Sequence, residues 1–377
     1  MDVSKCTACG ACAEKCPTRV PNEFNFGLDE RKAIYKDYAQ GIPSQFTIDP
    51  EHCRVMQGQK CGVCAKVCQA KAIDYEMKDS DVELNVAAVI ISTGYELFDA
   101  TQIPEYGYGK LPNVISSLEM ERLLSAGGPT RGHLTRPSAI HAEIQAKEVS
   151  KLIKKAEKAE DAAQAAELQK EQEKLERHAA KYHTAKKLGF IQCVGSRDFR
   201  FHKYCSSYCC MHSIKEAIIA REHESETQSY IFYMDLRTVG KGFEEYKVRG
   251  ANVSGLKYIR GRVAEVGQDE ELNPVIYYED TEKRMVQSLT LDMVILANAC
   301  SASRGIVDLA NLLGVELEEN NFVKTHPHRP LDTSIPGIFT CGCAQGPLDI
   351  PESVAQASSA AARAAEVVMT GGRALAV

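Results

Sequence analysis

Apolar runs alternate with helical patterns along the second half of the chain. The runs are LNVAAVIIST, which ends at Thr93 and is followed by Gly94, and the segments 188–194, 230–235 and 291–297. A helical pattern from Ile214 to Glu224 precedes the run at 230–235. Continuous apolar strands that alternate with helices are typical of parallel sheets covered on both faces. The pattern predicts an α/β domain of the doubly wound type.

A different pattern occupies 138–187, where glycine and proline are absent and Ala, Glu, Lys and Gln dominate. Its apolar positions recur at helical spacing: Ile144, Val149, Ile153, Ala156, Ala159 and Ala163. Such a stripe predicts one long helix or an antiparallel helical hairpin, and we favour the hairpin. The segment is either a solvated surface insertion or a docking arm for a partner subunit.

Composition limits the classes of protein to consider. The chain has 377 residues, 44 % hydrophobic and 25 % charged, with a net charge of −6. This length suits about two or three domains, and the charge gives no reason to expect nucleic acid. No apolar run reaches the ~18 residues of a membrane span. The start MDVSKC carries no apolar signal stretch, so we expect a reducing and anaerobic cytoplasm.

Twelve of the fifteen cysteines fall into three groups. The first has the spacing C-x2-C-x2-C-x3-C-P and the second C-x7-C-x2-C-x3-C, a pattern of ferredoxins with two [4Fe-4S] clusters. In such ferredoxins the fourth ligand is exchanged between the motifs. We therefore assign one cluster to Cys6, Cys9, Cys12 and Cys68, and the other to Cys16, Cys53, Cys61 and Cys64. Zinc and disulfides are the alternatives: zinc has no use for the closing C-x3-C-P, and disulfides would need an oxidising compartment.

The third group consists of Cys193, Cys205, Cys209 and Cys210, with the spacing C-x11-C-x3-C-C. It follows the apolar run 188–194 and leads into the predicted helix. Thiolates at the first turn of a helix are favoured by its N–H groups. The spacing permits a third [4Fe-4S] cluster or a redox disulfide between Cys205 and Cys209. We interpret the remaining Cys300, Cys341 and Cys343 as unligated small hydrophobes.

The runs FIQCVGSRD, YCSSYCCMHSIKEA, FYMDLRTVGKGFEEY and GIFTCGCAQGPLDIPESVAQASSAAARAA resemble the heterodisulfide reductase A-subunit family. The resemblance covers nearly the whole chain except the helical segment. It implies a ferredoxin domain at 1–80 and a thioredoxin-reductase-like FAD domain at 81–377, with the insertion at 138–187 and an unconventional [4Fe-4S] cluster at 193–210. It also implies a split form of bacterial type without the N-terminal G-x-G-x-x-G portion.

The resemblance further implies a FAD completed by a partner chain. Its expected contacts on this chain are Thr93, Gly94, Gly342, Cys343, Ala344, Gln345, Gly346 and Ser353. Lys215, with Glu119 as its candidate carboxylate partner, is expected at the reactive edge of the flavin. Related flavoproteins carry Gly-Asp where Gly342 and Cys343 stand, which weakens one contact. Because the strand that usually precedes a nicotinamide site ends here in Cys193, we expect no NAD(P)H site.

The leading hypothesis is an electron-transfer subunit of an anaerobic multisubunit oxidoreductase that uses FAD and three [4Fe-4S] clusters. The resemblance implies flavin-based electron bifurcation, other subunits of a heterodisulfide-reductase-like complex, and a ferredoxin or a hydrogenase- or dehydrogenase-type donor. Heterodisulfide reduction, a quinone-linked sulfur complex and a benzoyl-CoA-reductase-type complex remain open as terminal reactions. The alternative is a non-catalytic iron–sulfur scaffold without flavin.

Overall fold

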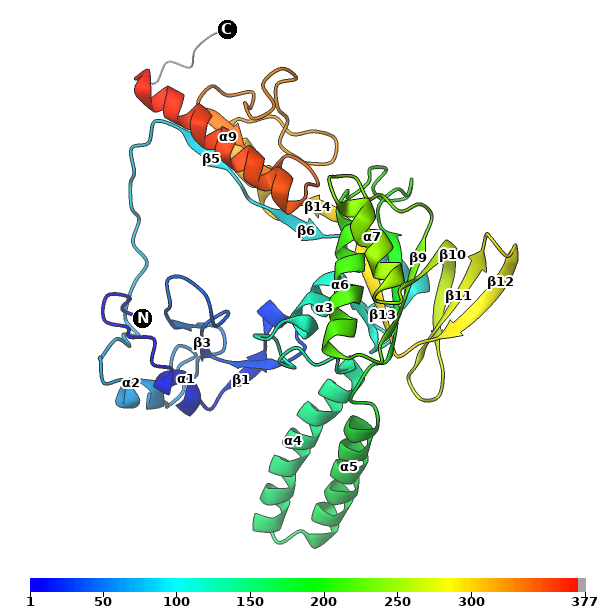
Figure 1. Ribbon diagram of the computed structural model, residues 1–377. Coiled ribbons are helices and arrows are strands. Elements are labelled where there is room, and N and C mark those ends of the chain that lie inside the picture. Colours follow the sequence, from blue (N-terminus) through cyan, green and yellow to red (C-terminus); the bar gives the residue numbers. More distant parts are fainter. Residues whose placement is uncertain (372–377) are drawn as a thin grey trace. The chain divides into compact units, whose positions relative to one another are not determined.

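The computed structural model describes residues 1–371 (Figure 1). Their packing separates two compact units, Met1–Val82 with Leu118–Ala185 and Glu83–Ser117 with Lys186–Val377. Each unit joins segments that are distant in the sequence. The helical segment thus falls in the same unit as the cysteine-rich N-terminal region, whereas the strands of the predicted α/β domain belong to the second unit.

Short elements and loops make up the N-terminal part of the first unit. They are α1 (Ala11–Lys15), β1 (Arg19–Pro21), η1 (Glu23–Asn25), β2 (Glu30–Lys32), β3 (Ile34–Tyr35), β4 (Thr47–Ile48) and α2 (Val63–Val67). Strand β1 pairs with β2, and β3 with β4, both antiparallel. Each short helix begins after a glycine with positive φ, 80° at Gly10 and 113° at Gly62. Only glycine adopts such a conformation at little cost, which lets each cysteine loop turn directly into its helix.

The helical part of the first unit consists of α3 (Ser117–Leu124), α4 (Pro137–Lys158) and α5 (Ala162–Lys181). Helices α4 and α5 run side by side as an antiparallel hairpin, as predicted (Figure 1). The side chain of Asp161 caps α5 by accepting a hydrogen bond from the N–H of Gln164 at 3.0 Å. Predicted stripe residues Ala159 and Ala163 are exposed, because the chain reverses between them.

The buried face of the hairpin is made of small and β-branched side chains. Helix α4 buries Ala142, Ala146, Val149, Ile153 and Ala156, and α5 buries Ala165 and Ala179. Small residues at this spacing let two helices approach closely along their length. The apolar side chains of the predicted stripe are thus buried largely by packing of α4 against α5.

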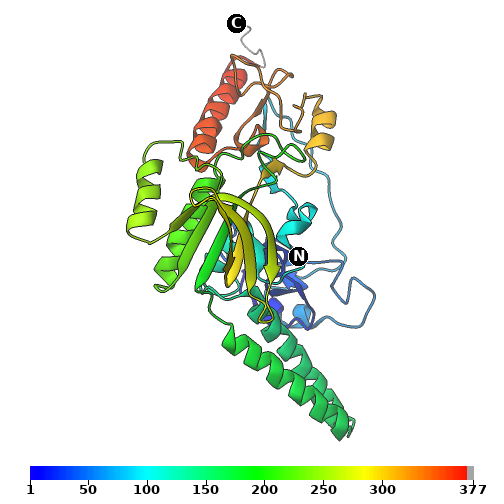
Figure 2. The same cartoon turned by 90° about the vertical axis from the view of Figure 1, so that its right-hand side faces the viewer.

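The second unit is built on a seven-stranded sheet of order β12-β11-β10-β9-β8-β13-β7. Its strands are β7 (Val114–Ser116), β8 (Lys187–Val194), β9 (Gln228–Tyr233), β10 (Lys257–Gln268), β11 (Pro274–Asp280), β12 (Met285–Thr290) and β13 (Met293–Asn298). The neighbours from β10 to β7 are parallel, and β10, β11 and β12 form an antiparallel meander (Figure 2). The α/β class is confirmed, with strand bounds close to the predicted apolar runs.

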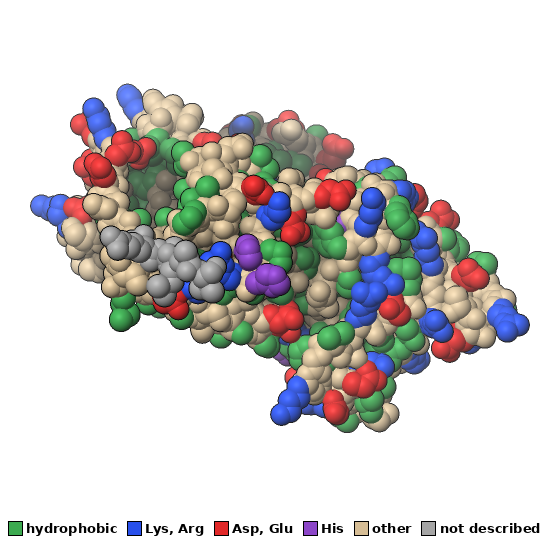
Figure 3. Space-filling model, turned by 90° about the horizontal axis from the view of Figure 1, so that it is seen from above, with side chains coloured by type: hydrophobic (Ala, Val, Ile, Leu, Met, Phe, Trp, Pro, Cys, Tyr) green, Lys and Arg blue, Asp and Glu red, His purple; other side chains and the backbone are tan. Residues whose placement is uncertain are grey.

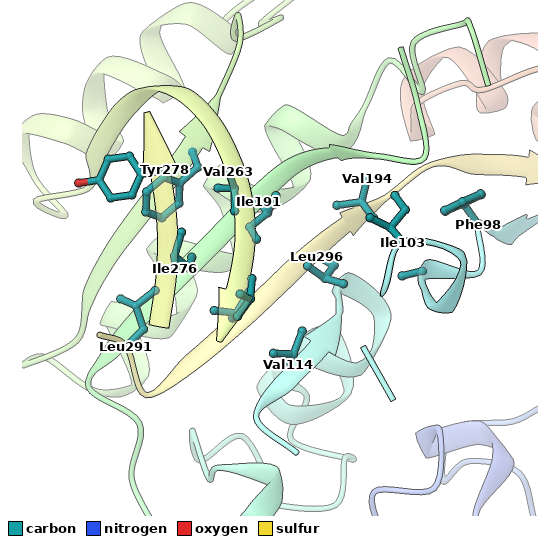
Figure 4. Packing of buried hydrophobic residues seen from close by; sticks show 14 of the residues in the cluster. Phe98, Ile103, Val114, Ile191, Val194, Val263, Ile276, Tyr278, Leu291 and Leu296 are labelled. Carbon is teal, nitrogen blue, oxygen red and sulfur yellow. The ribbon is translucent and has the colours of Figure 1, made fainter. Parts of the chain in front are cut away.

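Apolar side chains fill both faces of this sheet. On one face, α6 (Cys209–His223) packs against β8, β9 and β13, and α7 (Phe243–Asn252) packs against α6. On the other, the meander folds over so that Val263 and Ile276 join Ile191 and Leu296 in one buried cluster (Figure 4). Burial of this many apolar side chains, at about 25 cal/mol per Å² of apolar surface, gives the sheet a core of its own.

The remaining elements surround a short parallel pair. They are β5 (Val89–Ile91), β6 (Tyr95–Leu97), η2 (Ala100–Gln102), η3 (Pro104–Tyr106), β14 (Cys300–Ala302), α8 (Ile306–Leu313), β15 (Ile338–Thr340), η4 (Gly342–Ala344) and α9 (Ile350–Met369). Strand β5 pairs only with β15, in parallel, and β6 pairs with β14. The predicted strand LNVAAVIIST is wrong in its first half: residues 84–87 are exposed and form no strand.

The surface of the described residues carries both charged and exposed hydrophobic side chains, such as Ile42 and Leu312. Figure 3 shows acidic and basic side chains interspersed on the face that it presents. Within residues 1–371, no helix combines the length and the apolar character that crossing a membrane requires.

Candidate functional site

Four cysteines of the first unit share one apolar cavity. Cys16, Cys53, Cys61 and Cys64 line it, and Ala33, Ile34 and Ile48 form part of its wall. The hydrogen bond from the N–H of Val63 lowers the pKa of Cys61. Four convergent thiols, one of them with a lowered pKa, are the donor set that a [4Fe-4S] cluster requires. The apolar wall limits the access of water to these ligands. The residues present fit such a cluster.

A second cavity of the first unit collects Cys6, Cys9, Cys12 and Cys68. The N–H of Ala72 donates a hydrogen bond to Cys68 Sγ at 3.3 Å, whereas burial raises the pKa of Cys12. The fold therefore groups the first three cysteines of one motif with the last cysteine of the other. This is the arrangement that the exchanged-ligand assignment requires.

In the first unit, Tyr75 contacts Cys64, and the sequence did not predict this contact. Its hydroxyl lies 2.8 Å from Cys64 Sγ and lines the same cavity as the four cysteines. Burial, followed by the bond with Cys64, raises the pKa of Tyr75. Tyr75 thus stays protonated and can donate its hydrogen bond to a Cys64 thiolate. The eleven-residue separation from Cys64 carries no recognisable motif.

The third cysteine group lies where β8, an inner strand of the sheet, ends. Cys193 is the penultimate residue of β8 and has a φ of 62°, while Cys209 and Cys210 begin α6. Cys205 and Cys210 are near enough to Cys193 for their charges to raise the pKa of its thiol, and all three act in the same way on the pKa of Cys209. The parallel sheet explains this arrangement, because a strand end and the following helix start meet at its carboxyl edge.

Arg197 opposes the effect of burial on the pKa of the Cys193 thiol. Burial raises the pKa of Cys193 to about 11, and a hydrogen bond from Arg197 opposes that rise. Arg197 itself forms an ion pair with Asp235, which follows β9. A cationic side chain next to buried thiols favours their thiolate form, which is the form that ligates iron. The group fits a metal cluster, and Arg197 would compensate part of the cluster's negative charge.

The predicted flavin contacts gather at the carboxyl ends of β5 and β15. Ser303 Oγ donates a hydrogen bond to Thr93 Oγ1 at 2.8 Å, and the N–H of Gly342 donates one to Gln356 Oε1 at 2.8 Å. Gly94 has a φ of 72°, and a side chain added there would meet no atom within 4 Å. The open space beside Gly94 suits the close approach of a cofactor to the backbone.

The other expected contacts take part in the internal structure of this loop. Gln345 Nε2 donates to Thr325 Oγ1 at 3.0 Å, and Gln345 Oε1 accepts from Gln356 Nε2 at 2.7 Å. Ala344 is buried, and Ser353 lies beside Gly342. The carbonyl oxygen of Gly342 also accepts from the N–H of Gln345 at 3.0 Å. Among the predicted contacts, Gly94 and Gly346 retain open space for a cofactor, whereas Gln345 acts within the loop.

Lys215 and Glu119 belong to different compact units. Lys215 lies half-buried on α6 in the second unit, and Glu119 is buried on α3 in the first. Their pairing and their approach to a flavin stay predictions.

The three cysteines outside the groups lie in the second unit. Cys341 packs in an apolar cluster with Leu331 and Phe339. Cys300 is completely buried, and the half-buried Cys343 donates a hydrogen bond from Sγ to the carbonyl oxygen of Leu348 at 3.5 Å. Their interpretation as unligated small hydrophobes stays a prediction.

Comparisons with known proteins agree with the cysteine chemistry. Residues 1–22 match the 4Fe-4S binding domain family. Over 365 residues the chain is 40 % identical to the iron-sulfur A subunit of CoB–CoM heterodisulfide reductase from Methanocaldococcus jannaschii, covering 96 % of this chain and 48 % of the relative. It is 42 % identical to the second form of that A subunit from Methanopyrus kandleri, covering 98 % and 50 %. The chain is thus similar over nearly its whole length to the heterodisulfide reductase A-subunit family.

The family also includes a protein of Archaeoglobus profundus that is named as similar to the heterodisulfide reductase A subunit. It is 38 % identical over 98 % of this chain and 53 % of its own length. The chain spans about half the length of the curated relatives it matches. Among solved structures, thioredoxin reductase of T. acidophilum aligns with a TM-score of 0.41 at 13 % identity, covering 75 % of this chain and 65 % of that one.

Proposed function

We propose that this chain is an electron-transfer subunit of an anaerobic oxidoreductase complex of the heterodisulfide reductase type. The observation that carries the proposal is the sorting of eight cysteines into two cavities of four, with four more at the end of β8. That number of convergent thiols suits three [4Fe-4S] clusters. The names of the relatives support a role in a complex with further subunits.

The first unit would carry the two ferredoxin clusters. Its cavities hold each set of thiols in a mainly apolar surrounding, which limits water near the ligands. In the second unit, Cys193, Cys205, Cys209 and Cys210 would hold the third cluster, with Arg197 beside it. When bound, a flavin supplies two-electron chemistry and an iron–sulfur cluster accepts or gives one electron at a time.

The flavin would occupy the loop at the ends of β5 and β15, in a domain of thioredoxin-reductase type. Gly94 and Gly346 leave room for it, and the hydrogen bond between Ser303 and Thr93 fixes one wall. Strands β5 and β15 form a two-stranded parallel sheet. A doubly wound FAD domain has more parallel strands, with the glycine turn at the first of them. We therefore propose that another polypeptide segment adds the missing strand and turn beside this pair.

Lys215, together with Glu119, is proposed to act at the flavin edge, where a cation stabilises a reduced, anionic flavin. Electron bifurcation, a cytoplasmic location and exchange with a ferredoxin or a hydrogenase-type donor form part of the same proposal. They rest on the similarity of the chain to its relatives and on its number of reduced cysteines.

Flavin content tests this proposal against the scaffold alternative. The complex is purified under anaerobic conditions, and FAD, iron and the rate of electron transfer from its donor are measured on one sample. We expect bound FAD and about twelve iron atoms per copy of this chain. A complex without FAD, with about eight iron atoms per chain, would contradict the flavoprotein proposal and favour a scaffold.

A further inference from the structure

A cavity of about 320 Å³ lies at the carboxyl ends of β8 and β9, beside residues 261–263 of β10. All of its lining residues belong to the second unit. The crevice outside the carboxyl ends of parallel strands is where α/β sheets commonly bind ligands. Of the third cysteine group, Cys193 lines the cavity, whereas Cys205, Cys209 and Cys210 do not. The cavity is therefore not the space that a cluster on these four thiols would fill.

The floor of the cavity is apolar. It is formed by Ile191, Phe232 and Val263, each of which is at most 4 % exposed. The three side chains belong to the buried cluster of the sheet, in which Figure 4 labels Ile191 and Val263. Half-buried Tyr106 and Tyr233 add two rings to the lining. An apolar floor and this volume are typical of pockets for small organic molecules, which measure about 300–1,000 Å³.

The charged residues that line the cavity are three arginines and one aspartate. Asp198 accepts a hydrogen bond from Arg200 at 2.9 Å, and Arg197 forms an ion pair with Asp235. Arg262 lies 3.9 Å from Asp198 and has no closer carboxylate within residues 1–371. Its side chain is 69 % exposed. The lining thus carries an excess of positive charge, and the guanidinium of Arg262 keeps its hydrogen-bond donors for a ligand.

Two neutral polar residues also line the cavity. Gln192 and Ser196 are buried, and the amide of Gln192 and the hydroxyl of Ser196 have no hydrogen-bond partner in the described part of the chain. Buried polar groups in native proteins nearly always have a partner. These two side chains therefore retain unused hydrogen-bond capacity at the wall of the cavity.

We propose that this cavity binds a small organic anion, whose carboxylate or phosphate pairs with Arg262 and Arg200 and whose apolar body lies on the floor. The planar fork of an arginine matches the two oxygens of either group. Because the turn after β8 carries Cys193 in place of a glycine cradle, the ligand is a single small anion rather than a dinucleotide. The proposal goes beyond the proposed function and requires neither the flavin nor a cluster.

Isothermal titration calorimetry with four probes tests the site on the full chain, prepared under anaerobic conditions with its iron. Naphthoate and naphthyl phosphate present the same apolar body with either anion, whereas naphthol and inorganic phosphate present the body or the anion alone. We expect at least one naphthyl anion to bind about tenfold more tightly than naphthol and inorganic phosphate, and the tighter of the two identifies the anion. No binding of either naphthyl anion at about 10 mM would overturn the proposal. Binding of naphthol or inorganic phosphate as tight as that of the naphthyl anions would also overturn it.

Arg262→Gln tests the role of the arginine, with Arg304→Gln as its matched control. Arg304 belongs to the same unit, is 89 % exposed and does not line the cavity. We expect Arg262→Gln to weaken binding of the tighter naphthyl anion about tenfold or more, because a charge-assisted hydrogen bond is lost, and to leave the affinity for naphthol unchanged. Arg304→Gln should bind as the wild type does. An equal loss in both variants, or no loss in Arg262→Gln, would contradict the assignment.

FAD and iron are measured on the same samples, so the two proposals fail separately. Binding of the anion to a chain without FAD, or with about eight iron atoms, contradicts only the proposed function. FAD and about twelve iron atoms without binding of a naphthyl anion contradict only the anion site.

Discussion

The two regions that carry the cysteine groups present similar sets of thiols on opposite kinds of scaffold. In the first unit, α1 and α2 have five residues each, and loops supply most of the eight thiols. In the second, Cys193 is the penultimate residue of an eight-residue strand that is mostly buried, and Cys209 and Cys210 begin a helix of 15 residues. The second scaffold presents its thiols from a long strand and helix that pack into a large apolar core, whereas the elements beside the thiols of the first region are short. We infer that the bound group contributes much more to folding in the first region.

The largest expected effect comes from removing ligand pairs in each region. Cys61→Ser/Cys64→Ser should unfold the N-terminal region, because binding energy at such a site is folding energy. Cys209→Ser/Cys210→Ser should leave the sheet folded, because Ile191, Leu296 and their neighbours still pack. Limited proteolysis of the two anaerobic variants makes the comparison. Equal resistance of the N-terminal region in both would contradict the difference that we infer.

The next largest effect is expected from substituting one glycine with positive φ in each region, Gly195 in the second and Gly62 in the first. Alanine at Gly195 would bring its Cβ to 2.2 Å from a ring carbon of Phe98 at a φ of 82°, whereas Gly62, with a φ of 113°, has nothing within 4 Å. The backbone cost at positive φ is about 1–2 kcal/mol, and overpacking adds about 1–3 kcal/mol.

We therefore expect Gly195→Ala to lower the free energy of unfolding by about 2–5 kcal/mol, against about 1–2 kcal/mol for Gly62→Ala. Urea unfolding, followed separately for each unit, measures both values. A smaller loss for Gly195→Ala than for Gly62→Ala would show that packing against Phe98 does not support the Cys193 turn.

Asp49 holds the loop that presents Cys53. It accepts hydrogen bonds from Arg31 at 2.9 Å and from the N–H of Glu51 at 3.0 Å, and its carbonyl oxygen accepts from the N–H of Cys53 at 2.9 Å. Burial raises the pKa of Asp49, but the bonds from Arg31 and His52 outweigh burial and lower it.

Because the folded pKa is depressed, Asp49 stabilises the fold fully above its unfolded pKa of about 3.9, and this contribution is lost as the pH falls through the folded pKa. Asp49→Asn should cost about 1–3 kcal/mol at pH 7 and flatten the loss of stability in acid. Exposed Glu51→Gln is the control. An acid slope in Asp49→Asn as steep as that of the wild type would exclude this role.

The smallest expected effect concerns Tyr75. Its hydrogen bond to Cys64 stabilises the more negative, reduced form of a cluster at that site, so Tyr75→Phe should lower the reduction potential. A net hydrogen bond of about 0.5–1.5 kcal/mol corresponds to roughly 20–60 mV for one electron. Redox titration followed by electron paramagnetic resonance measures the shift, with exposed Tyr38→Phe as control. A potential that stays constant or rises would contradict the role of this contact.

Local spacing explains which parts could be predicted. Eight ferredoxin cysteines and the hairpin of α4 and α5 follow patterns within short windows, and the apolar runs mark β8, β9 and β13. What was missed depends on distant contacts. The amphipathic strands β10 to β12 lack a continuous apolar run, β5 is limited to the residues that pair with β15, and Tyr75 meets Cys64 through loop geometry.

The most direct test of the central claim counts iron in one pair of proteins. Wild-type chain and Cys209→Ser/Cys210→Ser, both prepared under anaerobic conditions, are compared by iron content and by electron paramagnetic resonance of the reduced state. We predict about twelve iron atoms in the wild type and about eight in the variant, with the two ferredoxin signals retained. Equal iron content and identical spectra in the two proteins would contradict a third cluster at the end of β8, and with it the proposed electron path.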